Sequence, residues 1–230
     1  MIGIYGGTFN PVHLGHLRAA EEVAEILSLS RMLFVPSARP PHKDDAEQII
    51  APPDQRLAWL ESALADNPLF VVDAIEIERP GASYIVDTLT ALGERYPDEE
   101  LVFVVGQDAF RDMGNWREPE KIFAMTHIAM TTRPPAPAAP LSSCLPKVVE
   151  NDFEIARDEG SARHRKSGTW IRQLEIIALD ISATAIRARL ARGSSIRYLV
   201  PAPALEAIVS GGCYTHAMDP SPQPDSKRKE

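Results

Sequence analysis

The sequence is poor in cysteine, in long apolar runs and in positive charge. Its 230 residues include only two cysteines, Cys144 and Cys213, which are too few for a disulfide framework. No Cys-x-x-Cys spacing occurs, so neither a zinc site nor a redox motif is indicated. No apolar run approaches the roughly 20 residues that span a bilayer, and the first residues reach a glycine turn without room for a signal peptide. We therefore expect no membrane partner and a cytoplasmic location.

Acidic residues outnumber basic ones. Asp plus Glu number 32 and Lys plus Arg number 24, giving a net charge of -8 at pH 7. A protein that neutralises phosphates along a nucleic acid needs a basic surface, so we expect no nucleic-acid partner. The basic run RHRK at residues 163–166 is short and typical of a solvated loop. Nothing in the sequence indicates an oligomeric state.

An apolar content of 44% over this length is enough for one sizeable core. We expect a single domain over residues 1–215, with a small helical part at about 182–212. Residues 216–230 are polar and rich in proline, which is typical of a disordered tail.

Short apolar runs alternate with segments of helical period, a pattern that predicts a doubly wound, Rossmann-like α/β fold. Such a fold has a mainly parallel sheet with helices on both faces. The predicted strands are 2–5, 32–35, 69–72 with an extension to 77, 101–105, 127–132 and 174–181. The predicted helices are 14–27, 54–66, 83–96 with Ser83 as N-cap, 118–125, 183–191 and 202–209. Proline-rich segments 36–53 and 133–147 predict loops, and 150–169 has too little pattern to assign.

The first segment that indicates chemistry is GGTFNPVHLGH at residues 6–16, between the first strand and the first helix. Glycines let the backbone approach a ligand closely, and a helix N-terminus favours an anion. His13 and His16 stand three apart, so they share one face of the first turn and can reach the same phosphate. A glycine or a histidine alone would more simply indicate a tight turn or a core residue. Their joint occurrence favours phosphate binding.

The second segment is ISATAIR at residues 181–187, at another expected strand-to-helix junction. Ser182 and Thr184 supply hydroxyls at a helix start, and Arg187 supplies donors suited to phosphate oxygens. Taken alone, the segment would more simply indicate an ordinary N-cap followed by a surface arginine.

Together, GGTFNPVHLGH and ISATAIR resemble the paired signatures of the nucleotidyltransferases with a histidine-x-glycine-histidine motif. VPSARPPHK, ASYIVDTL, VVGQDAF and NWREPEKI extend the resemblance, up to about Tyr214, to the nicotinate-nucleotide adenylyltransferases of bacteria. The resemblance implies transfer of AMP from ATP to nicotinate mononucleotide in NAD biosynthesis, giving deamido-NAD and pyrophosphate. It implies direct in-line attack without a covalent intermediate. We expect Mg²⁺ to arrive with ATP and no metal site in the protein, because no carboxylate cluster looks like a metal cage.

The resemblance also implies roles for individual residues of the ATP site. His16, Arg187 and His13 are the expected catalytic residues. The remaining expected ATP contacts are Gly7, Thr8 and Phe9 along the phosphates, Ser182 and Thr184 on the triphosphate, and Gly106 and Asp108 at the adenosine.

The acceptor, nicotinate mononucleotide, is expected at a second set of residues. Thr88 would form a hydrogen bond and Trp116 would stack on the pyridine ring. Lys43 would contact a phosphate from its loop, with His42 a weaker candidate. Arg133 would face the pyridine carboxylate or a phosphate.

The chain departs from the family pattern at two positions. Asn10 stands where the family often has Asp, which removes a charge and keeps a good capping residue. Ala183 follows Ser182 where the family often has a second hydroxyl residue, so one side-chain contact to phosphate is lost.

Two alternative functions remain open from the sequence. One is a related adenylyltransferase that acts on nicotinamide mononucleotide or phosphopantetheine. The other is a non-catalytic module that binds ATP. A nicotinamide-dependent oxidoreductase is disfavoured, because the Gly-x-Gly-x-x-Gly fingerprint is missing.

Overall fold

The computed structural model describes residues 1–39, 49–132, 139–177 and 179–215. Within these residues an eight-stranded sheet has the order β3-β2-β1-β4-β5-β8-β7-β6. The strands are β1 (Ile2–Gly7), β2 (Arg31–Pro36), β3 (Phe70–Val72), β4 (Leu101–Gly106), β5 (His127–Thr132), β6 (Phe153–Ile155), β7 (Ser161–His164) and β8 (Trp170–Glu175).

Helices precede and follow most strands. They are α1 (Leu14–Leu27), α2 (Pro53–Leu64), α3 (Ile75–Glu78), α4 (Ile85–Arg95), α5 (Gln107–Asp112), α6 (Pro119–Met125), α7 (Leu141–Cys144), α8 (Ala183–Ala191) and α9 (Ala202–Ser210), with 3-10 turns η1 (Met113–Asn115) and η2 (Glu150–Asp152). Across the described ranges, none of these helices has the length and apolar character needed to cross a membrane.

The six strands from β3 through β2, β1, β4 and β5 to β8 are parallel, β6 and β7 are added antiparallel beyond β8, and the Rossmann-like α/β fold is confirmed. The chain leaves β1 to build β2 and β3 on one side, then returns to build β4 and β5 on the other. The strand order therefore reverses between β1 and β4. In open α/β sheets, ligands bind outside the carboxyl ends of the strands at such a reversal.

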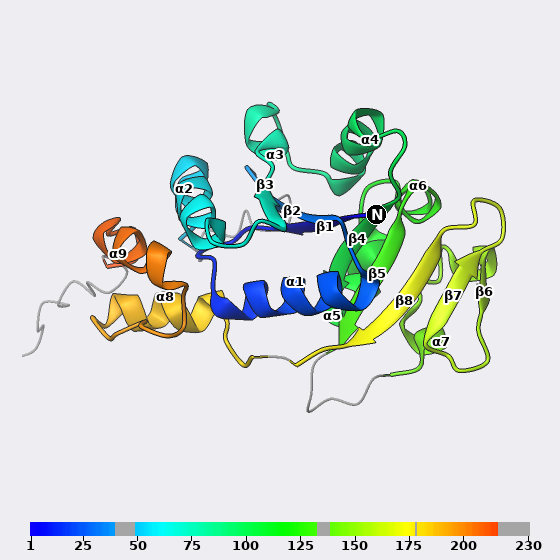
Figure 1. Ribbon diagram of the computed structural model, residues 1–230. Coiled ribbons are helices and arrows are strands. Elements are labelled where there is room, and N and C mark those ends of the chain that lie inside the picture. The colour runs from blue at the N-terminus through cyan, green and yellow to red at the C-terminus, as the bar shows by residue number, and fades with distance from the viewer. Residues whose placement is uncertain (40–48, 133–138, 178, 216–230) are drawn as a thin grey trace, which may run out of the picture.

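Two apolar cores sandwich the sheet. Side chains of α1, α2 and α8 join those of alternate strand residues, such as Phe34 and Val104, on one face. Side chains of α4, α5 and α6 pack on the other face against Ile4, Phe103 and Met130. Figure 1 shows α1 along one face and α4 over the other. Strand β4 lies in the middle of the parallel strands and is buried on both faces.

The prediction that the third strand extends to residue 77 is wrong. The strand ends at Val72, and the Asp73 side chain accepts a hydrogen bond from the Ile75 amide (3.1 Å), which starts α3. Ser83 is also not the cap of the next helix, which begins at Ile85 after Tyr84. The Ser83 hydroxyl instead accepts hydrogen bonds from the amides of Ala38 and Arg39.

The strand predicted at 174–181 is β8, which begins earlier and ends at Glu175. The apolar run continues beyond Glu175, but Ile177 is 68% exposed and its amide bonds to the Glu22 side chain of α1. The unassigned stretch 150–169 holds the antiparallel strands β6 and β7. The sequence gives little sign of them because they are only three and four residues long.

Gly3 permits close packing between β1 and the turn before β2. A Cβ atom there would lie 2.7 Å from Leu29 Cδ1 and 2.7 Å from Met32 Sδ, inside a filled core. We expect Gly3→Ala to lower the free energy of unfolding by about 1–3 kcal/mol, as overpacking does. Urea denaturation measures this change. Gly93→Ala is the matched control, since a Cβ at this position of α4 meets no atom within 4 Å and should stabilise the helix by about 0.5–1 kcal/mol. Equal effects of the two substitutions would contradict the packing argument.

Candidate functional site

The loop after β1 folds back on itself around Phe9. Phe9 has a φ of 47° and is only 2% exposed. Its ring lies over Gly7, where a Cβ atom would come within 3.1 Å of it. The same ring meets His16 edge-on, with centroids 5.1 Å apart. The absence of a side chain at Gly7 thus leaves room for the Phe9 ring, and the Phe9 ring in turn packs against His16.

His13 and His16 lie together at the start of α1. His13 is the N-cap residue, and its backbone amide donates to His16 Nδ1 (3.2 Å). The two imidazole rings stack with centroids 3.6 Å apart. Because Nδ1 of His16 accepts a hydrogen bond, the neutral ring carries its proton on Nε2, which is therefore a donor. The structure brings the two predicted histidines together on one face.

The buried Arg56 also holds this loop, and it is not among the residues predicted from the sequence. Its Nη1 donates to the Thr8 carbonyl (2.7 Å), its Nε to the Ala51 carbonyl (2.8 Å) and its Nη2 to the Ala38 carbonyl (3.3 Å). A sequence signal was present, because Arg56 occupies a position in the stripe of α2 that also buries Trp59, Leu60, Ala63 and Leu64. A charged residue at such a core position calls for a specific set of partners.

The second predicted segment reaches the same loop from the other end of the chain. Ser182 is the N-cap of α8, its hydroxyl accepting a hydrogen bond from the Ala185 amide (3.1 Å). Arg187 donates through Nη1 to the Asn10 carbonyl (2.9 Å) and through Nη2 to the Thr184 hydroxyl (3.2 Å). Burial lowers the pKa of Arg187, yet an arginine remains charged at neutral pH. The structure thus places a guanidinium beside the loop that carries the two histidines.

Gly106 and Asp108 stand at the end of β4, the strand next to β1. Gly106 is the N-cap of α5, and a Cβ atom there would meet nothing within 4 Å. Asp108 is exposed in the first turn of the same helix. Both predicted adenosine contacts therefore lie at the carboxyl edge of the sheet, facing open space.

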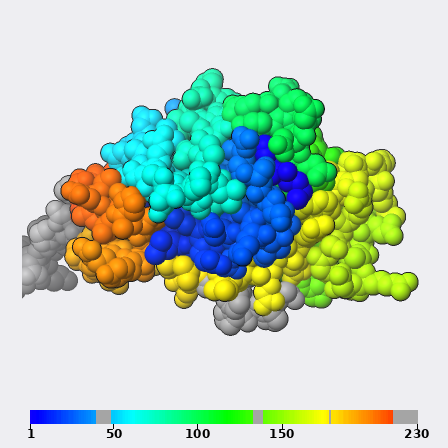
Figure 2. All heavy atoms as spheres, viewed as in Figure 1, coloured from blue at the N-terminus to red at the C-terminus, as the bar shows by residue number. Residues whose placement is uncertain are grey.

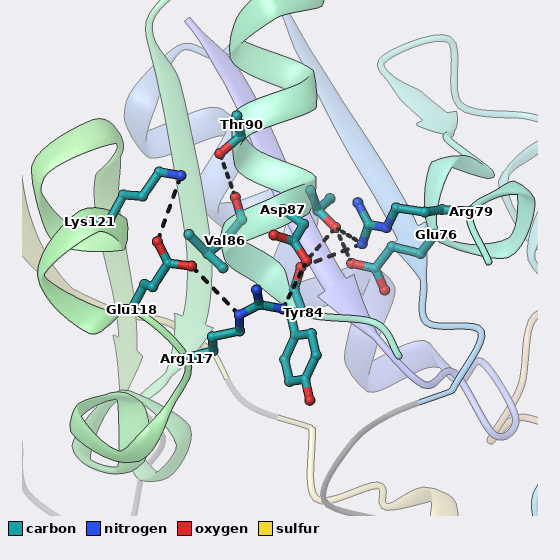
Figure 3. Close-up of polar contacts among 10 residues, drawn as sticks. Glu76, Arg79, Tyr84, Val86, Asp87, Thr90, Arg117, Glu118 and Lys121 are labelled. Carbon is teal, nitrogen blue, oxygen red and sulfur yellow. Dashed lines mark hydrogen bonds and ion pairs between the residues drawn. The ribbon is translucent and has the colours of Figure 1, made fainter. Parts of the chain in front are cut away.

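Trp116 follows the 3-10 turn after α5. Its Nε1 donates to Asp112 (3.3 Å), and its ring meets Phe103 of β4 edge-on at 6.2 Å between centroids. The ring is half-buried, so part of it remains accessible for stacking. The adjacent Arg117 ties this turn to α4, through an ion pair with Asp87 (3.6 Å) and a cation-π contact with Tyr84, as Figure 3 shows for the ion pair.

Glu76 and Arg79, which Figure 3 labels beside the start of α4, form a polar network with the buried Thr88. Its side chain is fully buried, and its hydroxyl donates to Glu76 Oε1 (2.6 Å) and accepts from Arg79 Nη2 (3.0 Å). Burial raises the pKa of Glu76, and the hydrogen bond from Thr88 and the charge of Arg79 offset part of that rise. In this structure Thr88 therefore links α3 to α4. Its expected hydrogen bond to the mononucleotide stays a prediction.

Three of the expected contacts, Lys43, His42 and Arg133, lie outside the described residues. Among the residues that the structure describes, no group of three or more His, Cys, Asp or Glu side chains is placed to hold a metal ion.

The fold and the loop geometry are those of a nucleotidyltransferase. The chain belongs to the cytidylyltransferase-like family, whose model matches residues 4–189. It is similar over nearly its whole length to curated bacterial relatives. It is 44% identical over 214 residues to the probable nicotinate-nucleotide adenylyltransferase of Geobacter sulfurreducens, covering 93% of this chain and 98% of that protein. The protein of the same name from Geobacter metallireducens is also 44% identical, over 93% of this chain and 98% of its own length.

Solved structures support the same fold at lower sequence identity. The nicotinic acid mononucleotide adenylyltransferase of Plasmodium falciparum, complexed with NaAD, superposes with a TM-score of 0.69. It is 16% identical to this chain and covers 93% of it, and 96% of the Plasmodium chain is matched.

The buried Glu76 predicts a pH dependence of stability. Because its pKa is raised in the folded state, the native protein holds this proton more tightly than the unfolded chain does. The stabilising effect of that proton is complete at low pH and is lost as the pH rises from the ordinary carboxyl range through the raised pKa. Glu76→Gln keeps an acceptor for Thr88 and removes the titration. We expect the unfolding free energy of the variant, relative to that of the unmodified protein, to increase with pH across this window. Urea denaturation at a series of pH values tests it, and parallel stability curves would contradict the burial argument.

Proposed function

We propose that this chain is a nicotinate-nucleotide adenylyltransferase, which transfers AMP from MgATP to nicotinate mononucleotide and releases pyrophosphate. The observation that carries the proposal is the hydrogen bond from Arg187 to the Asn10 carbonyl, which joins the two phosphate segments across 177 positions of sequence. The identity of 44% to curated relatives of that name, over 93% of the chain, supports the choice of reaction.

The transfer is a single in-line displacement. A phosphate oxygen of nicotinate mononucleotide attacks the α-phosphorus of ATP, a new P–O bond forms, and the bond from that phosphorus to the bridging oxygen breaks. The electron pair leaves with pyrophosphate. A phosphate oxygen is a competent nucleophile at neutral pH, so no general base is needed, and positioning and charge stabilisation provide the catalysis.

The residues of this chain supply those two effects. His16 donates from Nε2 toward the reacting phosphate, because its Nδ1 is occupied by the His13 amide. Arg187, anchored at Asn10 and Thr184, retains further N–H groups for the triphosphate. Gly106 and Asp108 take the adenosine at the next strand end. Magnesium enters as part of the substrate, MgATP.

The acceptor binds on the side of β4 that faces α4. Trp116 stacks on the pyridine ring, and Thr88, Lys43 and Arg133 complete the proposed contacts. The runner-up reactions use nicotinamide mononucleotide or phosphopantetheine at the same place. Pyrophosphate release with MgATP and each of the three acceptors in parallel distinguishes them. Release that is strong with nicotinate mononucleotide alone supports the proposal, and release with none of them, despite ATP binding, favours a non-catalytic module.

His16→Ala is expected to lower kcat by about a hundredfold or more, the effect of losing one preorganised donor to the transition state. Steady-state pyrophosphate release measures it. His127→Gln is the control. His127 is the first residue of β5, at the amino end of the strand and away from the carboxyl edge where the site lies, and its ring stacks on Trp170. A fall of less than threefold in the His16 variant, with substrate binding unchanged, would contradict the assigned role.

Trp116→Ala is expected to raise KM for the mononucleotide by about tenfold and to leave KM for ATP unchanged, because aromatic stacking contributes about 1–3 kcal/mol. Trp116→Phe keeps an aromatic face and should retain most of the affinity. An equal loss toward both substrates would show that Trp116 only supports the fold.

A further inference from the structure

Asn10 is the point at which three separate parts of the chain meet. It is 4% exposed, and its side chain makes three hydrogen bonds. Nδ2 donates to the Ile49 carbonyl (2.9 Å), while Oδ1 accepts from the Ala51 amide (3.0 Å) and from the Tyr214 hydroxyl (2.5 Å). Its backbone carbonyl accepts from Arg187 (2.9 Å). One residue thus ties the phosphate loop to the approach to α2, to α8 and to the end of the described chain.

Tyr214 is held in place by α2 rather than by the phosphate loop alone. Its ring is 3% exposed and lies 6.1 Å from the Trp59 ring. The neighbouring Cys213 thiol donates to Gln55 of α2 (2.8 Å). Figure 2 shows the orange surface of the C-terminal helices packed directly on the cyan surface of α2 and the blue surface of the N-terminal segment.

The chemistry of Tyr214 suits a permanent donor. Burial raises its pKa far above the neutral range, so the hydroxyl stays protonated and continues to donate to Asn10. The oxygen of an amide accepts two hydrogen bonds, and Asn10 Oδ1 has two donors in this structure.

We propose that Tyr214 and Asn10 are positioning residues for the adenylyl transfer, in which the Tyr214 hydroxyl fixes the Asn10 side chain and thereby the carbonyl that anchors Arg187. This inference rests on the proposed function, because it gives the C-terminal segment a task in that reaction. The side chain and the carbonyl of Asn10 belong to one residue, so loss of the Tyr214 bond allows the Asn10 backbone to shift and moves Arg187 with it. A misplacement of about 1 Å in such a group costs up to about a hundredfold in rate.

The central variant is Tyr214→Phe, which keeps the ring and its packing and removes only the hydroxyl. Thr126→Val is the matched control. Thr126 is 2% exposed and its hydroxyl donates to the Leu101 carbonyl (2.9 Å), at the amino end of β4 and away from the phosphate loop. Each substitution removes one buried hydroxyl hydrogen bond, so both should lower the melting temperature to a similar extent.

The kinetic effects should differ. We expect Tyr214→Phe to lower kcat/KM for ATP by about tenfold, with KM for nicotinate mononucleotide unchanged, at a temperature where both variants are fully folded. Thr126→Val should keep the kinetic constants of the unmodified protein. Equal kinetic constants for the two variants would overturn the inference, because a purely structural tyrosine would behave like Thr126.

A double-mutant cycle tests the route through Asn10. If Tyr214 acts through Asn10, Tyr214→Phe has no further effect on kcat/KM for ATP in an Asn10→Ala background. Additive effects would show that the tyrosine acts elsewhere.

Equilibrium binding of a non-hydrolysable ATP analogue separates this inference from the proposed function. We expect Tyr214→Phe to weaken that binding and Thr126→Val to leave it unchanged. If the unmodified protein releases no pyrophosphate with any acceptor, the proposed function fails, and a selective loss of analogue binding in Tyr214→Phe still supports the positioning of the phosphate site. Equal analogue binding in both variants, in a protein without transfer activity, would overturn the positioning role as well.

Discussion

Three backbone carbonyls, from Thr8, Ala38 and Ala51, converge on the fully buried guanidinium of Arg56. A buried charge requires partners, and none of the salt bridges found among the described residues includes Arg56, so carbonyl dipoles solvate it instead. These bonds fix the turn after β1, the segment after β2 and the approach to α2 relative to one another. The cost of burial appears as a lowered pKa of Arg56. Arg56 thereby supports the loop after β1 from the side of α2.

The rest of the site is assembled on that fixed loop. The Asn10 side chain accepts a hydrogen bond from Tyr214 of the C-terminal segment, and the Asn10 carbonyl accepts one from Arg187 of α8. The chain carries a net charge of -8, so cationic groups must be gathered locally to meet a triphosphate. The fold achieves this by bringing α1 and α8, from opposite ends of the sequence, to the carboxyl ends of the parallel strands.

The parallel strands could be predicted because each is an apolar run bounded by turn residues. β4 and β5 are examples, and their neighbouring helices show clear helical period. The antiparallel strands β6 and β7 could not, because strands of three or four residues, interrupted by charged side chains such as Glu154 and Arg163, carry no distinctive pattern. The boundary of β8 was misjudged for the opposite reason, since its apolar run continues into Ile177, which is exposed.

The candidate site residues also fall into those that a sequence motif marks and those that only the fold reveals. His13, His16 and Arg187 stand in short motifs whose spacing already indicates phosphate chemistry, and the fold places them together. Thr88 shows the limit of motif reading, because its hydroxyl is engaged by Glu76 and Arg79, whose side chains come from another helix and its C-terminal boundary. Arg56 and Tyr214 carry no motif, and only their burial and partners show what they hold.

The sequence by itself determined the α/β architecture, the chain segments that form the parallel strands and the two motifs that are candidates for phosphate binding, because these depend on local period, turn chemistry and residue type. The tertiary structure alone decided which distant groups meet. Hydrogen bonds spanning 48, 177 and 204 positions join Arg56 to Thr8, Arg187 to Asn10 and Tyr214 to Asn10. Such contacts arise only after the sheet and its helices have packed. In the unfolded chain water satisfies these polar groups, and only burial makes a hydrogen-bond partner within the protein necessary.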